Sequence, residues 1–432
     1  MTKIYTLLAI SVGVVLLIIS MFTPMREALI IIATVGLLAV YYKSGFVAFF
    51  ILLAAYFPMY SLVYAWLSGV SYVNHMNHGL QEDAALMLQT IIYYFISIST
   101  AIVIIFSNFK IKPMRRRFLI ADGYYGYSNI SMAIFTSMFL FFFWLTDPGE
   151  TFLTASYSVL LTQRFENTQF SGTLGLIIWI SCFVSYKTTL FKSRKIFVLR
   201  YFNMATVISI LWLALHAKRV ELIAILLSYL LYDLKEKKEK KVIIYSIVMF
   251  FILTGIGGIR EIFVKDVIIT NELNQYVASL PGGASNVFMS LSLVIDFYKE
   301  NGLLYGETFY NYFFQLLPSF VYSIIPYAPP KPFDSIGIFS MYDWNGGINF
   351  MSIFYANFGI LGSILSGIFV GVYVLIVYNL LRQKEFIYKI ISIYMFGMSL
   401  GFFWYELITV IKPVSLIILF YVGYLLLPRK NV

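Results

Sequence analysis

Long runs of apolar residues, separated by short polar stretches, recur from one end of the chain to the other. A helix that crosses a bilayer needs roughly 20 mostly apolar residues, and this pattern predicts about twelve such helices. They occupy residues 4–21, 28–42, 45–67, 87–106, 130–145, 173–186, 201–217, 220–232, 242–256, 357–380, 390–407 and 413–427. The sequence therefore predicts an all-α polytopic membrane protein, with residues 1–432 forming one integral membrane domain. We interpret residues 4–21 as a retained helix rather than a cleaved signal peptide.

The polar segments between the predicted helices differ greatly in length. Three of them face the outer side in the twelve-helix arrangement and are long, namely residues 68–89, 147–172 and 257–356. The last lies between the ninth and tenth helices and contains a predicted short helix at 287–298, an aromatic stretch at 309–314 and a Pro- and Tyr-rich stretch at 318–332. We therefore expect one long extracytoplasmic loop, with short helices, to cover the outer face.

Composition and charge support a membrane location. The chain is 60% hydrophobic and 12% charged, whereas about a quarter of the residues in an average soluble domain are charged. Its net charge of +10 comes from clusters of basic residues in short loops, and the predicted inner segments hold 22 of the 31 lysines and arginines. This bias follows the positive-inside rule, so both termini are expected in the cytoplasm and no nucleic-acid partner is expected. The single cysteine, Cys182, excludes a disulfide framework.

Five of the outer cations border apolar helices or glycine-rich segments, where a solvated surface charge is least expected. They are Arg164, Lys218, Arg219, Arg260 and Lys265. A guanidinium group binds phosphate oxygens through two parallel hydrogen bonds and stays charged at neutral pH. Grouped around an outer cavity, these residues would attract an anion, such as a lipid-linked pyrophosphate. The alternative is that each simply reaches the outer membrane surface along its own helix.

Three outer residues are candidates for a general base. Glu406 lies at the outer end of the predicted helix 390–407, and carboxylates in or near membrane helices are functional candidates. Asp343 and His216 are the next candidates, and Asn345 beside Asp343 is a candidate for sugar binding. The alternatives are an ion pair between Glu406 and Lys412, a structural role for His216, and an interfacial belt for the neighbouring aromatic residues.

Several other chemistries lack their usual signatures in this sequence. It contains no Walker-type phosphate loop, no zinc-ligand pair and no nucleophile elbow. The short outer loops also lack paired aspartates near a helix start, so a metal-bound nucleotide sugar is not expected as a donor. We expect neither a cofactor nor a metal.

Four local patterns follow one another along the chain. The first is Arg164, then ten residues, then Gly175, and the second is Ala217-Lys218-Arg219 ahead of an apolar helix. The prolines of residues 318–332 form the third, and Gly346-Gly347 followed by Tyr355-Ala356-Asn357-Phe358-Gly359 forms the fourth. In this order they resemble bacterial O-antigen and oligosaccharide repeat-unit polymerases of the Wzy type. The chain departs from that family's Gly-X-Arg pattern by lacking the glycine, and a second arginine–glycine spacing from Arg260 fails at Asn271.

The resemblance implies metal-independent glycosyl transfer on the outer side of a bacterial cytoplasmic (inner) membrane. Its substrates would be oligosaccharides carried on undecaprenyl pyrophosphate, and its product an O-antigen or capsular polysaccharide. Arg164, Arg219 and Arg260 would bind the donor pyrophosphate with help from Lys218 and Lys265, while Glu406, Asp343 or His216 would deprotonate the acceptor. The resemblance also suggests a chain-length regulator and a flippase as protein partners.

Three other functions are consistent with parts of the pattern. A flippase or transporter of lipid-linked oligosaccharide would also need many helices and a cationic cavity, but would show two similar halves, which this sequence does not. An O-antigen ligase would use the same donor with a different acceptor. A non-enzymatic scaffold is the fourth interpretation.

Overall fold

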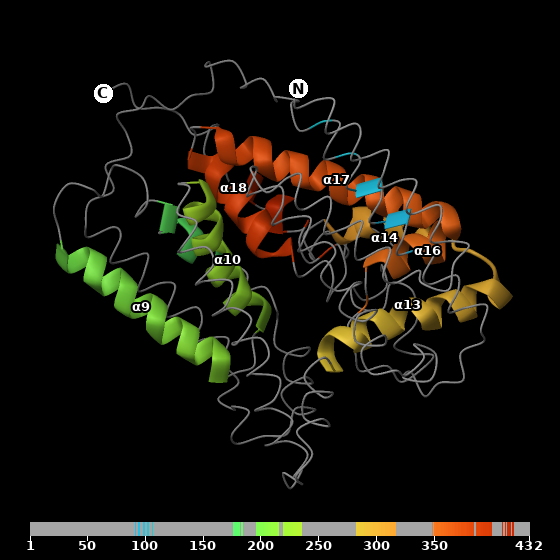
Figure 1. Cartoon of the computed structure of the whole chain (residues 1–432), viewed down its shortest axis with the longest axis horizontal. Helices are drawn as coiled ribbons and strands as arrows, with labels where there is room; N and C mark the ends of the chain where they lie inside the picture. The colour runs from blue at the N-terminus through green and yellow to red at the C-terminus, as the bar shows by residue number, and fades with distance from the viewer. Residues whose placement is uncertain are drawn as a thin grey trace, which may run out of the picture. The chain divides into compact units, whose positions relative to one another are not determined.

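The computed structural model describes the chain in several helical ranges (Figure 1). The described residues are 91, 94, 95, 98, 99, 102, 106, 176–181, 183, 184, 196–215, 219–235, 282–316, 348, 350–383, 386–399, 408, 411, 413–415, 417 and 418. Within them the chain forms helices and turns and no strand, which confirms the predicted all-α class for that part. The chain divides into two compact units, which we describe separately.

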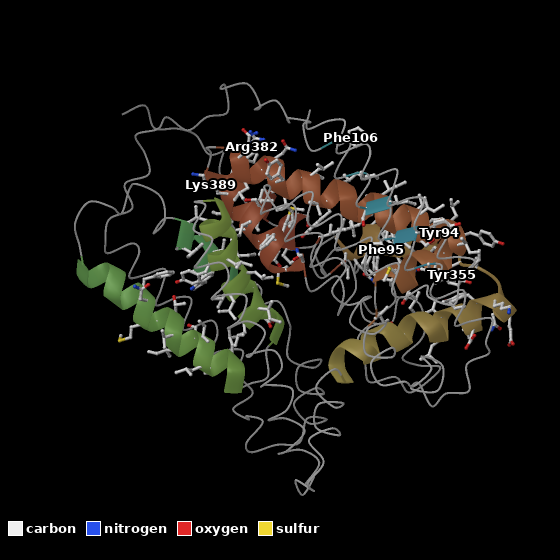
Figure 2. All side chains as sticks on the ribbon, in the orientation of Figure 1. Tyr94, Phe95, Phe106, Tyr355, Arg382 and Lys389 are labelled. Carbon is white, nitrogen blue, oxygen red and sulfur yellow. The ribbon has the colours of Figure 1, made fainter. Side chains whose placement is uncertain are left out.

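Helix α17, Ile360–Arg382, is the one helix among the described residues that is long and apolar enough to cross a membrane. Its 23 residues correspond to about 35 Å at 1.5 Å per residue, against about 30 Å of hydrocarbon in a bilayer. One side of α17 carries exposed apolar side chains, namely Leu361, Ile368, Val372 and Ile376. A helix that faces lipid needs such an apolar stripe. Arg382 in its last turn and Lys389 flank the connection to the next helix (Figure 2).

The first unit contains α13 (Gly282–Asn301), α14 (Glu307–Gln315), α16 (Phe350–Phe358) and α17 through Tyr378. Both α13 and α14 contact α16. Two glycines of α17 allow a segment from the predicted helix 87–106 to approach closely. A Cβ atom added at Gly367 would lie 3.0 Å from the Phe95 carbonyl oxygen, and one at Gly371 would lie 2.7 Å from Ile102 Cβ. Small residues at such contacts are typical of packing between membrane helices.

The second unit contains α9 (Ile196–Leu215), α10 (Arg219–Lys235) and α18 (Phe386–Gly397). Helix α10 packs against both α9 and α18. Trp179 is buried beside α9, where its Nε1 donates a hydrogen bond to Thr206 Oγ1 at 3.1 Å. On the other face of α9, Met204, Val207, Ile208 and Leu211 are exposed. An exposed apolar face of this kind suits contact with lipid.

The predicted helices in the described ranges are present, with shifted ends. The predictions 201–217, 220–232 and 390–407 correspond to α9, α10 and α18, and the predicted short helix 287–298 is the core of α13. The predicted single helix 357–380 is wrong at its start, because Gly359 adopts φ +60° and separates α16 from α17. Helix α14 was predicted only as an aromatic stretch of the loop.

Candidate functional site

Only one of the nine residues predicted for the site falls in the part of the chain that the structure describes. Arg219 is the first residue of α10. The others lie outside the described residues, namely Arg164, Lys218, Arg260, Lys265, Asn345, Glu406, Asp343 and His216. Candidate site features are therefore taken unit by unit, from α10 and its neighbours in the second unit and from α13, α14 and α16 in the first.

The beginning of α10 carries two opposite charges. Arg219 opens the helix and Glu221 lies in its first turn. A carboxylate is favoured near a helix N-terminus because the exposed N–H groups carry partial positive charge, whereas a cation is disfavoured there. Arg219 therefore adds a full positive charge to an end that is already electropositive. Such an end, where N–H groups have no partner within the helix, attracts anions.

Glu221 of α10 has a polar neighbour in α18. Tyr394 of α18 is fully buried, and the Glu221 carboxylate lies close enough for the two groups to interact electrostatically. The Tyr394 hydroxyl is buried and makes no hydrogen bond within the described ranges. A buried polar atom usually has a partner, so this hydroxyl requires a reason.

The packing of α10 on α18 fixes the place where these two side chains meet. A Cβ atom added at Gly397 would lie 3.0 Å from the Ala224 carbonyl oxygen and 3.1 Å from Ala224 Cβ. The two backbones are thus in near contact one turn along from Glu221 and Tyr394. This contact leaves little room for water between the helices, which strengthens any electrostatic interaction there.

Glu221 was missed by the sequence analysis, although the signal was present. It lies inside the predicted apolar helix 220–232, and the rule that selected Glu406, a carboxylate in a membrane helix, applies equally to Glu221. A carboxylate in such a position is a candidate to accept a proton from a substrate hydroxyl. The alternative role is to hold α10 against α18.

In the first unit, Asn357 joins the loop to α16. Its Oδ1 accepts hydrogen bonds from the backbone N–H groups of Gly306 at 3.0 Å and Thr308 at 3.3 Å, and its Nδ2 donates to the Ile353 carbonyl at 2.7 Å. The backbone N–H groups of Leu304 and Tyr305 also donate to the carbonyls of Ala356 and Asn357. The N-terminus of α14 is therefore capped by a side chain from another helix. This contact gives a structural role to the Tyr-X-Asn-Phe-Gly pattern.

A carboxylate and a phenol meet where α13 packs on α16. Burial raises the pKa of the Asp296 carboxyl, and Glu300 raises it further, while Lys299 opposes both effects. Tyr355 is buried, and burial raises the pKa of its phenol, with an added contribution from the Asp296 charge. Asp296 also was not selected from the sequence, although it lies within the predicted helix 287–298.

Within the described ranges, no group of three or more His, Cys, Asp or Glu side chains is arranged to hold a metal ion. Comparison with protein-family models, with curated proteins and with solved structures finds no match for this chain.

Proposed function

We propose that this chain is a glycosyltransferase of the bacterial cytoplasmic membrane. It polymerises undecaprenyl-pyrophosphate-linked oligosaccharide repeat units into O-antigen or capsular polysaccharide on the outer side of that membrane. We further propose about twelve membrane spans of roughly 20 residues each, with both termini in the cytoplasm. The observation that most supports this proposal is the first turn of α10, where Arg219 precedes the partly buried carboxylate of Glu221 and Tyr394 lies beside that carboxylate.

The first step of the proposed mechanism is recognition of the donor pyrophosphate. Arg219 and the N–H groups at the start of α10 attract its negative charge. Arg164, Arg260, Lys218 and Lys265 supply further positive charge from the other outer segments, and Asn345 contacts the sugars. Positive charge in this place stabilises the extra negative charge that develops on the pyrophosphate as its bond to the sugar breaks.

The second step is transfer of the sugar chain. The acceptor hydroxyl oxygen forms a bond to the anomeric carbon of the donor, and the bond from that carbon to the pyrophosphate oxygen breaks. The lipid pyrophosphate leaves with the bonding electrons, and the hydroxyl proton moves to a carboxylate or imidazole. Glu221 joins Glu406, Asp343 and His216 as a candidate for this base. This reaction needs neither an oxidant nor a nucleotide, because the donor and the acceptor are both lipid-linked oligosaccharides.

The test is complementation of a strain that lacks the gene, read as a gel of its surface polysaccharide. The wild-type chain restores a ladder of polymer lengths, while Arg219→Ala and Glu221→Gln leave a single repeat unit on the acceptor. A general base or an oxyanion-stabilising group contributes roughly 100-fold or more to the rate, so long polymer disappears in both variants. Glu300→Gln changes an exposed carboxylate at the end of α13 and serves as the matched control with a normal ladder.

The same gel separates the competing functions. Loss of a ligase leaves full-length polymer unattached to its acceptor, and loss of a transporter leaves no repeat units on the outer side. Normal ladders from Arg219→Ala and Glu221→Gln, at wild-type amounts of protein in the membrane, reject the assignment of α10 to the active site.

A further inference from the structure

Helix α14 buries a mostly polar face and exposes aromatic side chains, which is the opposite of a usual surface helix. Its buried side chains are Thr308, Asn311, Tyr312 and Gln315, a mostly polar set spaced along one helix face. Its exposed side chains include Tyr310, which is 57% exposed, and Phe313, which is 65% exposed. A surface helix of a water-soluble protein buries its apolar face and exposes its polar face. The environment outside α14 therefore favours aromatic side chains.

The contacts of α14 hold it in this orientation. Asn357 Oδ1 accepts hydrogen bonds from the backbone of Gly306 and Thr308 at its start. The ring of Phe309 packs on Phe354 and Phe358, with centroids 4.9 Å and 5.7 Å away. Rotation of α14 about its axis would break these contacts, so the aromatic face is held outward by the rest of the unit.

The exposed face is a continuous aromatic surface. The rings of Tyr310 and Phe314 have centroids 4.9 Å apart, and those of Phe313 and Phe314 are 5.8 Å apart. Tyr305, just before the helix, is 82% exposed with a positive φ, and its N–H is bound to the Asn357 carbonyl. Glu307 is the only charged residue of α14. Tyrosine and phenylalanine without basic residues match the aromatic belt of membrane proteins rather than a surface attracted to anionic lipid.

The position of α14 along the fold explains this composition. Its start is bonded to Asn357, only three positions before the first residue of α17. Ile360 and Leu361 at that start are exposed, and they begin the apolar stripe of the one described helix able to span a membrane. The aromatic face therefore borders the place where the chain enters the apolar layer.

We propose that α14 is an interfacial helix whose Tyr305, Tyr310 and Phe313 side chains insert into the lipid bilayer where headgroups meet acyl chains. The buried polar face then faces the protein, and the helix anchors the long outer segment to the membrane surface. This proposal depends on the placement of α17 in a membrane and does not depend on glycosyltransferase activity. Because α14 carries no basic residue, its insertion is the same in zwitterionic and in anionic lipid.

The test uses the full chain in phosphatidylcholine vesicles with its single cysteine removed by Cys182→Ser. A bimane fluorophore is attached at Tyr310→Cys or Phe313→Cys. Glu300→Cys on the exposed end of α13 gives the aqueous control, and Val372→Cys on the exposed stripe of α17 gives the membrane control. We expect labels at 310 and 313 to be quenched by lipid with a doxyl group near the headgroup end of its acyl chain. Their quenching by aqueous iodide should be severalfold weaker than at 300.

Three results overturn the proposal. One is iodide quenching at 310 and 313 equal to that at 300, with no effect of doxyl lipid, which would place the face in water. The other is protection from both quenchers that disappears at one chain per nanodisc, which would show that a second copy covers the face. The same measurements in vesicles containing phosphatidylglycerol give the third readout, and a requirement for anionic lipid also contradicts the proposal.

Discussion

At the scale of single residues, Asn357 shows how one amide can organise a loop. It accepts two hydrogen bonds from the start of α14 and donates one to its own helix. The Asn357 side chain is fully buried. If it were replaced by an apolar residue, water could not reach the backbone groups that it now binds, and they would stay unpaired. The order of the segment that leads into α14 therefore depends on this side chain.

Replacement of Asn357 by alanine should destabilise the first unit. The change leaves two backbone N–H groups at the start of α14 without their acceptor, at a cost of about 2–4 kcal/mol. The matched control is Asn301→Ala, because Asn301 makes a similar hydrogen bond to the Phe297 carbonyl at 2.8 Å but is exposed. We expect a large fall in thermal unfolding temperature and faster proteolysis near α14 for Asn357→Ala only. Equal behaviour of the two variants would contradict the capping role.

Asp296 gives a prediction that depends on pH. Its pKa is raised in the folded chain from an ordinary value of 3.8. As pH rises above 3.8, the carboxyl ionises first in the unfolded chain, which lowers the free energy of unfolding until the folded carboxyl also ionises. Stability from this group is thus complete at low pH and lost as pH rises through that window. Asp296→Asn should therefore unfold at a higher temperature than wild type at pH 7, with the difference vanishing near the ordinary pKa.

The unfolding temperatures of wild type and Asp296→Asn can be compared by scanning fluorimetry of the detergent-solubilised chain, from the ordinary pKa of 3.8 up to pH 7. Glu307→Gln serves as the control, because the Glu307 carboxylate is exposed and is not among the charges that shift the pKa of Asp296. An unfolding temperature for Asp296→Asn below that of wild type at pH 7 would show that the carboxylate stabilises the folded chain instead.

At the scale of elements, the sequence predicted the apolar helices well and the turns between them less well. Periodicity and length located α9, α10, α13 and α18, because long apolar runs carry a strong signal. The break at Gly359 depends on a positive φ, which a run of apolar residues does not reveal. Helix α14 was not predicted as a helix, because its buried face is mostly polar. Helix prediction from periodicity expects the apolar face to be the buried one. Glu221 and Tyr394 are distant in the sequence, and only the packing of α10 on α18 brings them together.

The contact of α10 with α18 can be tested at Gly397. A valine there must fit side-chain atoms into space already occupied by the Ala224 backbone. Overpacking of this kind costs about 1–3 kcal/mol. We expect Gly397→Val to lower both the thermal unfolding temperature and the yield of long polymer, because it moves Tyr394 away from Glu221. Val207→Ile, which enlarges an exposed side chain of α9, should leave both measurements unchanged.

At the scale of the whole molecule, the proposed orientation places opposite ends of α17 on opposite sides of the membrane. Helix α17 begins at Ile360, close to the end of α13 and to the hydrogen bonds of Asn357. Its other end carries Arg382 in the last turn. The concentration of lysine and arginine in the predicted inner segments favours the cytoplasm for the Arg382 end.

Thiol labelling in intact cells tests this orientation. In a Cys182→Ser background, a membrane-impermeant maleimide should react with Asn301→Cys in intact cells and with Gln383→Cys only after permeabilisation. The exposed position of Asn301 makes its thiol accessible to the reagent. The opposite pattern would reverse the proposed topology and place the long outer segment in the cytoplasm.

The proposed activity is tested most directly with the purified full chain in lipid vesicles, supplied only with undecaprenyl-pyrophosphate-linked repeat units. We expect the wild-type chain to produce a ladder of longer oligosaccharides and one released lipid pyrophosphate for each bond formed, without added nucleotide. Both signals should be lost in Arg219→Ala and Glu221→Gln. The proposed activity is contradicted if the wild-type chain leaves the repeat units unchanged, or if the two variants produce the ladder at the wild-type rate.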